Sequence, residues 1–330
     1  MIPDTHPADN LLRPFDGNVP GISVLLLIDG NAVYARSLGM ADLERSAAVT
    51  IATNFRLASL TKQFTAAAIL RLAAHGALTL DTPIASFFER TPPFWRQISI
   101  HHLLTHTSGL VDYEELIEPN TATQLCDRDV LDLVQRVERS YAAPGAAFRY
   151  SNTGYCLLAL IIERVAGQPF AAFLRDQVFA PAGMHFSAVY QGEGSVIPRR
   201  AWGYSLHDGV FVRTDQNQTS ATQGDGGVYS SIIDLERWDA ALASDTLLPE
   251  TWRTAMFTPH VATPSGDHYG YGWFLTNIRS ERAACHTGET IGFRTAMVRL
   301  LDRRCTAIVL ANRSEAEPLP IAWALVEAAQ

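Results

Sequence analysis

The apolar residues near the two ends of the chain follow the pattern of β-strands. Residues 22–28 form an apolar run, Asp29 and Gly30 form a typical turn pair, and residues 32–38 resume a strand pattern. Because such a pair joins neighbouring antiparallel strands, the pattern predicts a hairpin whose first strand is buried on both faces. Towards the C-terminus, further strands are expected at residues 271–276, 283–286, 295–300 and 306–311.

Between these strands the apolar positions recur at the spacing of α-helices. One long pattern covers residues 61–76, is rich in alanine and leucine, and ends at Gly76, a residue type that commonly stops helices. Strands near both ends of the chain, with helices between them, predict an α+β fold in which both termini build one antiparallel sheet. Other helices are expected at residues 101–105, 129–140, 152–166, 169–179, 234–243, 249–256 and 321–329.

Composition and charge narrow the classes of function. The chain has 330 residues, of which 47% are hydrophobic and 18% charged, as in an ordinary globular protein. A net charge of −8 without any basic run argues against a nucleic-acid partner. The apolar pattern before Glu163 and Arg164 is too short to cross a bilayer, so no membrane span is expected.

The N-terminal residues and the cysteines bear on the compartment. The first residues lack the pattern of a secretory signal, which predicts a cytoplasmic protein as given, or a periplasmic or secreted one if a leader was removed. The four cysteines are scattered and do not form a metal-binding spacing. We expect them to be free thiols rather than disulfides: Cys126, Cys156, Cys285 and Cys305.

Ser59 and Lys62 stand at the start of the 61–76 helical pattern. Residues three apart share a helix face, and a neutral amine within hydrogen-bond reach can activate a serine hydroxyl as a nucleophile. Lys62 is the only lysine among 26 basic residues, and arginine, unlike lysine, cannot give up its proton in a protein. The alternative is coincidence, because a single lysine must stand somewhere. The pair therefore predicts a nucleophile and its base.

Two further polar groups each allow two interpretations. Tyr150, Ser151 and Asn152 precede an apolar helical pattern, so they are either a helix cap with a buried tyrosine or a group in which Tyr150 moves protons. His286 is expected at a strand end, where a histidine often only satisfies a hydrogen bond. The cluster of His101, His102 and His106 has no acidic or further histidine ligand at a recognised spacing, so a metal site is not expected.

Taken together, these motifs resemble the serine β-lactamase and penicillin-binding protein superfamily. The match is closest to its class C-like branch, which includes D-alanyl-D-alanine carboxypeptidases, D-aminopeptidases and family VIII esterases. The resemblance covers roughly residues 18–330 and is specific because five motifs occur in order. These are Ser59-x-x-Lys62, the stretch from His102 to Leu110, Tyr150-Ser151-Asn152, the stretch from Gly226 to Ser231, and His286-Thr287-Gly288.

The resemblance implies a β-lactamase/transpeptidase-like fold, with a five-stranded antiparallel sheet flanked by helices and an all-helical domain. We therefore expect residues 1–80 and 225–330 to form an α/β domain and residues 81–224 a mainly helical one, with the active site in the crevice between them. No metal or organic cofactor is implied.

The resemblance also implies roles for individual residues. Ser59 would be the acylated nucleophile, and Lys62 and Tyr150 would share general-base and general-acid work. Asn152 would hold the carbonyl side of the substrate, and the backbone N–H groups of Ser59 and Glu289 would form an oxyanion hole. In many relatives a lysine stands at the position of His286. The remaining substrate-binding residues would be Thr287, Gly288, Glu289 and Arg294.

The substrate is expected to be a small molecule or a short peptide. Relatives often hold a substrate carboxylate just after the third motif, where this chain has Glu289, a like charge that would repel it. Arg294 either compensates for Glu289 or pairs with it. We expect cleavage of an ester or a D-amino-acid amide. The alternatives are a true β-lactamase or carboxypeptidase acting on carboxylates, and a non-catalytic penicillin-binding sensor; the oligomeric state stays open.

Overall fold

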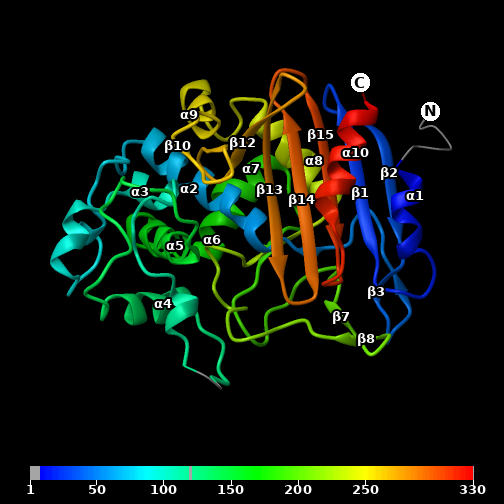
Figure 1. The fold of residues 1–330 in the computed structure, drawn as a ribbon, viewed down its shortest axis with the longest axis horizontal. Coiled ribbons are helices and arrows are strands. Elements are labelled where there is room, and N and C mark those ends of the chain that lie inside the picture. The colour runs from blue at the N-terminus through cyan, green and yellow to red at the C-terminus, as the bar shows by residue number, and fades with distance from the viewer. Residues whose placement is uncertain (1–7, 119–120, 330) are drawn as a thin grey trace.

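One antiparallel sheet runs through the molecule and is assembled from both ends of the chain (Figure 1). The computed structural model describes residues 8–118 and 121–329. Strands from the two ends meet where β1 pairs with β15. In spatial order the sheet contains β10 (Val261–Ala262), β11 (His268–Tyr269), β12 (Phe274–Ile278), β13 (Glu281–Thr290), β14 (Phe293–Leu300), β15 (Cys305–Ala311), β1 (Ile22–Ile28) and β2 (Asn31–Leu38).

The predicted N-terminal hairpin is confirmed. Strand β1 is hydrogen-bonded to β2 on one side and to β15 on the other, which explains its nearly uninterrupted apolar sequence. Its side chains alternate between two cores, with Val24 and Leu26 on one face of the sheet and Leu25 and Leu27 on the other. The turn residues Asp29 and Gly30 both have positive φ, as a tight two-residue hairpin turn requires.

The sheet has eight strands, not five, because β10, β11 and β12 extend it beyond β13. The strand expected at residues 271–276 begins later, since Gly272 has a positive φ and lies against the backbone of Lys62. Strand β13 is much longer than the expected 283–286. As a result, His286 lies within a strand and not at its end, and the expected turn falls at Gly292.

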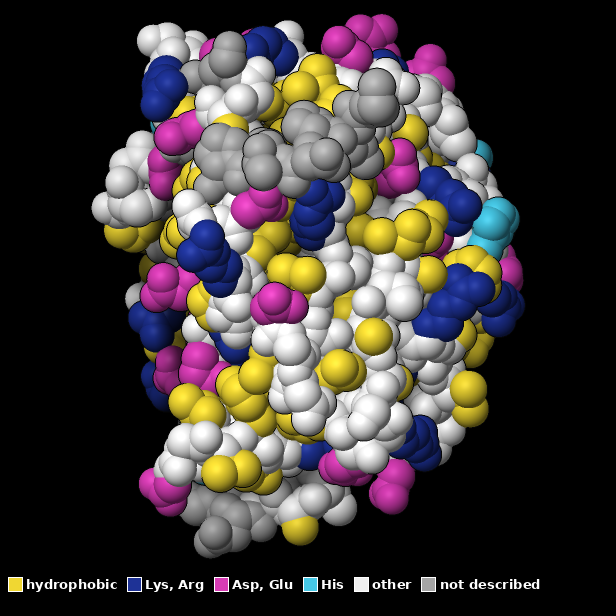
Figure 2. All heavy atoms as spheres, turned by 90° about the vertical axis from the view of Figure 1, so that its right-hand side faces the viewer, with side chains coloured by type: hydrophobic (Ala, Val, Ile, Leu, Met, Phe, Trp, Pro, Cys, Tyr) yellow, Lys and Arg dark blue, Asp and Glu magenta, His cyan; other side chains and the backbone are white. Residues whose placement is uncertain are grey.

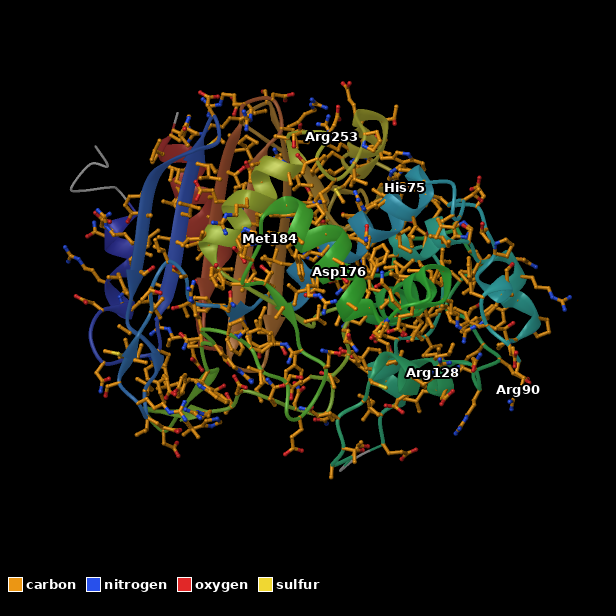
Figure 3. All side chains as sticks on the ribbon, turned by 180° about the vertical axis from the view of Figure 1, so that it is seen from behind. His75, Arg90, Arg128, Asp176, Met184 and Arg253 are labelled. Carbon is orange, nitrogen blue, oxygen red and sulfur yellow. The ribbon has the colours of Figure 1, made fainter. Side chains whose placement is uncertain are left out.

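Helix α2 (Thr61–Ala74) forms the centre of the larger core. All its residues except Arg71 and Ala74 are buried, and the polar side chains in its first turns are hydrogen-bonded inside the protein. Helices α5 (Asn152–Ala166) and α8 (Ile232–Leu242) pack on the same side of the sheet, and in the view from behind they lie beside the segment that contains Asp176 and Met184 (Figure 3). The opposite face is covered by α10 (Pro318–Ala328) and α1 (Asp9–Leu12).

Two expected helices differ in extent. The helix expected at residues 129–140 is α4 (Asp127–Val134), which stops because residues 136–140 offer one apolar side chain for packing. The helix expected at 169–179 is divided into α6 (Phe170–Leu174), a π-helical turn (Arg175–Phe179) and α7 (Ala180–Ala182). The remaining helices are α3 (Ile100–Leu104), α9 (Glu250–Met256) and the short 3₁₀ turns η1 (Arg13–Phe15), η2 (Ala58–Leu60), η3 (Ile84–Ser86), η4 (Pro93–Gln97) and η5 (Tyr113–Leu116).

Further short strands lie outside the main sheet. They form three small antiparallel sheets, of which one brings β9 beside β5, directly ahead of η2. Their bounds are β3 (Met40–Asp42), β4 (Ala47–Ala48), β5 (Phe55–Arg56), β6 (Ala188–Val189), β7 (Tyr204–His207), β8 (Val210–Arg213) and β9 (Val228–Ser230). The division into residues 1–80 with 225–330 and residues 81–224 stays a prediction.

The surface charges and the cysteines follow the pattern of the sequence, in which basic residues do not form a run and the cysteines are scattered. On the face that carries both termini, side chains of both charges are interspersed (Figure 2). In the described ranges no single helix is long and apolar enough to cross a membrane. One pair of helices joined by a bend, 152–166 and 170–182, has the length and composition of a membrane span when the two are taken together. The four cysteines are free thiols, as predicted, and two of them, Cys156 and Cys305, are buried.

Strand β13 touches η2 at a glycine. A side chain on Gly288 would overlap the carbonyl oxygen of Leu57 and the hydroxyl of Thr295. These two groups are themselves joined, since Thr295 Oγ1 donates to Leu57 O at 2.8 Å. The sheet can therefore approach η2 closely only where β13 lacks a side chain.

Replacing Gly288 with alanine is expected to lower the midpoint of thermal unfolding by well over 5 °C, because the overlap involves backbone. Gly76→Ala is the control: its site is open within 4 Å, so only the strain of its positive φ, about 1 kcal/mol, should appear. Equal unfolding temperatures for the two variants would contradict this account of the packing.

Candidate active site

Ser59 lies in η2, immediately before α2, and its side chain is half-buried. The preceding residue, Ala58, has φ of 48°, a left-handed conformation that costs a non-glycine residue roughly 1–2 kcal/mol. Leu57 N–H donates to Val228 O at 2.8 Å, which fixes the chain just before this bend. The strained bend places Ser59 directly before the N-terminus of the buried helix α2 (Thr61–Ala74).

Lys62 is completely buried and places its amine between three acceptors. Its Nζ lies 2.9 Å from Ser59 Oγ, 2.8 Å from Asn152 Oδ1 and 2.9 Å from the backbone oxygen of Asp225. A buried amine is stable only when its polar atoms are hydrogen-bonded, and here Nζ has three partners. These partners suit either the three protons of an ammonium, or the two protons of a neutral amine and a lone pair that faces the Ser59 hydroxyl. The contact predicted between Ser59 and Lys62 is present.

Tyr150 lies beside the amine, with Lys62 Nζ 4.9 Å from the centre of its ring. The ring of His106 packs against Tyr150 with centroids 4.3 Å apart, and His106 Nδ1 accepts the N–H of Ser151 at 3.1 Å. Burial, followed by the nearby Lys62, holds the pKa of His106 well below its usual value, so the ring is neutral. His106 thus positions the segment that carries Tyr150.

Asn152 connects Lys62 to an acidic group. Its Oδ1 accepts from Lys62, and its Nδ2 donates to Glu114 Oε1 at 2.8 Å. Ser151 is the N-cap residue of α5 but makes no side-chain capping bond; instead, the carboxylate of Asp112 accepts the N–H of Asn152 at 2.8 Å. The helix cap considered from sequence is therefore provided by a residue 40 positions away.

His286 is buried and uncharged. Its Nδ1 lies 2.7 Å from the carbonyl oxygen of Thr287 and must donate to it, which leaves Nε2 to accept from the hydroxyl of Tyr269 at 3.2 Å. Burial, with a smaller effect from Lys62, lowers the pKa of His286 to about 3. This side chain cannot supply the positive charge of the lysine found at this position in many relatives.

Arg294 pairs with Glu289, one of the two roles considered for it. Arg294 Nη2 lies 2.8 Å from Glu289 Oε1 across the β13–β14 pair, and Arg294 Nη1 also donates to Thr290 O at 2.7 Å. Because the Glu289 side chain is 74% exposed, the pair is well screened by solvent.

A cavity of about 370 Å³ opens beside Ser59 and contains most of the predicted residues. A smaller adjoining hollow shares several of these residues and adds Arg56 and Asp225 to its lining. Lys62, Gly288 and Arg294 do not line the cavity but lie behind it. Its lining consists of Ser59, Glu114, Tyr150, Asn152, Phe274, His286, Thr287 and Glu289.

Glu114 was not identified from the sequence. It lies in η5 at the rim of the cavity, and partial burial raises its pKa, while the bond from Asn152 opposes that rise. No motif marks Glu114, since it reaches the site through the fold of a short 3₁₀ turn. Its position makes it an acidic group within reach of a substrate.

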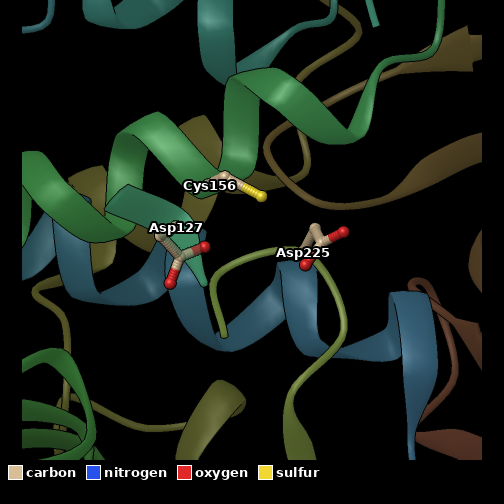
Figure 4. Close-up of side chains that lie close together, drawn as sticks. All are labelled: Asp127, Cys156 and Asp225. Atoms are coloured by element: carbon tan, nitrogen blue, oxygen red, sulfur yellow. The ribbon is translucent and has the colours of Figure 1, made fainter. Parts of the chain in front are cut away.

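One group among the described residues has the ligand types of a metal site. Oxygen and sulfur atoms of Asp127, Cys156 and Asp225 lie within 4.8 Å of one another (Figure 4). However, Asp127 uses its carboxyl group to accept the backbone N–H groups of Gln223 and Gly224. We therefore interpret the group as support for the 223–225 loop and assign no metal to it.

Comparison with known proteins agrees with the motifs and the fold. The model of the beta-lactamase family matches residues 8–330. The chain belongs to the beta-lactamase family. Penicillin-binding protein 4* of Bacillus subtilis (strain 168) is 34% identical to it, over 89% of this chain and 68% of the relative. Esterase EstB of Burkholderia gladioli is 29% identical, over 86% of this chain and 81% of the esterase.

A solved structure extends this agreement to the fold. The D-amino acid amidase from Ochrobactrum anthropi SV3 matches with a TM-score of 0.81 at 26% identity, over 97% of this chain and 95% of the amidase. This likeness confirms the β-lactamase/transpeptidase-like α+β fold. The family thus includes proteins named as penicillin-binding protein, esterase and amidase.

The low pKa of His286 predicts that acid destabilises the protein. The unfolded chain binds a proton at this histidine below pH 6.5, whereas the folded chain does so only near pH 3. Stability from this residue is thus present above pH 6.5 and is lost as the pH falls, by about 2 kcal/mol between pH 6.5 and pH 5.

Thermal unfolding of His286→Gln across this range should show a visibly smaller loss than the wild type. His268→Gln, which changes an exposed histidine on β11, is the control and should unfold with the pH dependence of the wild type. An unchanged slope for His286→Gln would refute the assignment.

Proposed function

We propose that the chain is a serine hydrolase that cleaves an ester or a D-amino-acid amide through an acyl-enzyme on Ser59. The main support is the contact of 2.9 Å between Ser59 Oγ and the buried Lys62 Nζ. In this mechanism Ser59 Oγ attacks the substrate carbonyl while its proton passes to Lys62 or Tyr150. The same pair returns a proton to the leaving amine or alcohol, and water then hydrolyses the acyl-enzyme.

The remaining predicted residues would hold the substrate. The oxyanion would be received by the backbone N–H groups of Ser59 and Glu289, since the start of a helix offers free N–H groups. Asn152 Nδ2 and the exposed Thr287 line the cavity where the carbonyl side of the substrate would lie. Phe274 supplies an apolar wall to the same cavity.

The charges around the cavity favour a substrate that carries an ammonium group or no charge. Glu114 and Glu289 are both in the lining. The nearby Arg56 already donates to Gly226 O, Gln216 Oε1 and Ser220 O, and His286 is neutral. A substrate carboxylate would meet acidic groups without an available cation among these lining residues. Because Arg294 pairs with Glu289, Glu114 is the stronger candidate for binding an ammonium.

A β-lactam-reactive protein is the second candidate. It is favoured by the likeness to a relative named penicillin-binding protein 4* and by the Arg294–Glu289 pair, which reduces the repulsion of a carboxylate. A sensor that acylates without turnover belongs to the same alternative.

The first experiment compares the wild type with Ser59→Ala. The enzyme is mixed briefly with a penicillin and its intact mass is measured, and turnover of p-nitrophenyl butyrate is followed separately. Ester turnover that disappears in the variant, with little penicillin adduct, is the expected result. A stable adduct on Ser59 would favour the penicillin-binding alternative. Rapid loss of penicillin without an adduct would indicate a β-lactamase. A lack of reaction with either substrate would refute the proposal.

The second experiment tests Glu114 with a D-amino-acid p-nitroanilide and its N-acetyl derivative. Glu114→Gln keeps an acceptor for Asn152 but removes the charge, so KM for the free amine should rise at least tenfold while that for the acetylated compound changes less than twofold. Because the pKa of Glu114 is raised, KM for the amine should also rise as the pH falls through the protonation of this group.

Glu115→Gln is the matched control, because Glu115 is the next residue of η5 and pairs with Arg149 outside the cavity. Its KM values should equal those of the wild type. If Glu114→Gln weakened both substrates equally, an ammonium site at Glu114 would be excluded.

A further inference from the structure

The third acceptor of Lys62 belongs to a loop. The backbone oxygen of Asp225 accepts from Nζ at 2.9 Å. Asp225 lies in the 222–227 loop, the last part of a stretch from residue 214 to 227 that is neither helix nor strand. The other acceptors, Ser59 and Asn152, lie at the starts of helices and are fixed by them. The position of the Lys62 amine therefore depends on the contacts that hold this loop.

Two helices make polar contacts with this loop. Thr65 of α2 donates from Oγ1 to Gly224 O at 2.7 Å, and Asp127 is the contact from α4. Asp127 is fully buried in the first turn of α4, and its two carboxyl oxygens accept the N–H of Gln223 at 3.2 and 3.1 Å. One of them also lies 3.4 Å from the N–H of Gly224. The next residue, Asp225, carries the carbonyl that meets Lys62. Arg128, which follows Asp127 in α4, is exposed and is labelled in Figure 3, where it shows the position of this helix.

The side chain of Asp225 points into the same buried space. It is 6% exposed, one of its oxygens has no hydrogen-bond partner among the described residues, and the other is 3.4 Å from the hydroxyl of Tyr113. Cys156 and Asp127 lie beside it (Figure 4). An incompletely bonded carboxyl group buried next to an amine is costly unless it has an electrostatic role.

We propose that Asp127 is a positioning residue for Lys62, acting through the 223–225 loop, and that the buried carboxyl of Asp225 sets the pH at which Lys62 or Tyr150 can accept the proton of Ser59. This inference rests on the proposed serine mechanism and adds a path from α4 to the nucleophile. The path runs from Asp127 through Gln223 and Gly224 to Asp225 O, and from there through Lys62 to Ser59.

Electrostatics supports the division of roles between the two acids. Burial, followed by the charge of Asp225, raises the pKa of Asp127 to about 8, so near neutrality Asp127 holds a proton. The ionisable groups that face Asp225 and Lys62 from the surrounding elements are Arg56, His106, Tyr113, Glu114, Asp127, Tyr150, Tyr155, Cys156 and His286.

The first test compares Asp127→Asn with Asp129→Asn. Asp129 is the matched control, since it lies one half-turn further along α4 and accepts a backbone N–H, that of Cys126 at 2.8 Å, but does not touch the loop. Asp127→Asn should lower kcat for the ester at least tenfold and leave KM within threefold, whereas Asp129→Asn should stay within twofold of the wild type. Equal kcat values for the two variants at similar unfolding temperatures would overturn the positioning role.

The second test uses Asp225→Asn, which retains the backbone carbonyl and removes the charge. Since a negative charge favours the protonated form of a nearby base, its removal should move the acid limb of kcat/KM against pH to lower pH, by about one unit. An acid limb that stays in place or moves to higher pH would refute the electrostatic role. The wild type is also measured after treatment with a metal chelator. If its acid limb then moves, a metal ion bound by Asp127, Cys156 and Asp225 supplies the charge, and the electrostatic role of Asp225 is refuted.

The two proposals fail in different ways. If wild-type turnover does not depend on Ser59, the proposed function is wrong. If turnover depends on Ser59 but Asp127→Asn behaves like Asp129→Asn and Asp225→Asn keeps the wild-type profile, only the present inference is wrong.

Discussion

The complete burial of one amine is the constraint on which the rest of this structure depends. Lys62 is inside the protein, where an amine without hydrogen bonds would be strongly destabilising, so acceptors must converge on it. They come from three separate parts of the chain: η2, the start of α5 and the 222–227 loop. The contact between Lys62 and Ser59 therefore depends on the correct packing of η2, α2, α5 and this loop against one another.

The charges around this amine define a site that differs from one built to hold an anion. His286 is neutral, the donors of Arg56 are occupied by backbone and side-chain oxygens, and Arg294 is paired with Glu289. Glu114 remains at the rim, held by Asn152, which also contacts Lys62. The same amide thus joins Lys62, proposed to act with Ser59, to the acidic group proposed to select the substrate.

The sequence is most informative where function depends on local spacing. Ser59 and Lys62 are three residues apart at a helix start, and the β1–β2 hairpin follows from an apolar run and a turn pair, so both are predictable from short segments. Glu114 and Asp127 are not, because each is a single carboxylate that meets its partner through tertiary packing. The strand count failed for a related reason: β10 and β11 have two residues each, too few to show a period, and are stabilised only by the neighbouring strand.

Two of the nine described non-glycine residues with positive φ lie in the candidate site. Ala58 adopts a left-handed conformation directly before Ser59, and His106 does the same beside Tyr150. Separately, Gly288 lets β13 approach the backbone of Leu57 because it has no side chain. The left-handed conformations of Ala58 and His106 are unfavourable alone. Contacts of Leu57 with Val228 and of His106 with Ser151 hold the two segments, and these segments carry Ser59 and Tyr150. Strain that is maintained in this way by surrounding packing is typical of functional sites. The stability of the core therefore supports a local conformation at Ser59 that a shorter segment of this sequence would not adopt.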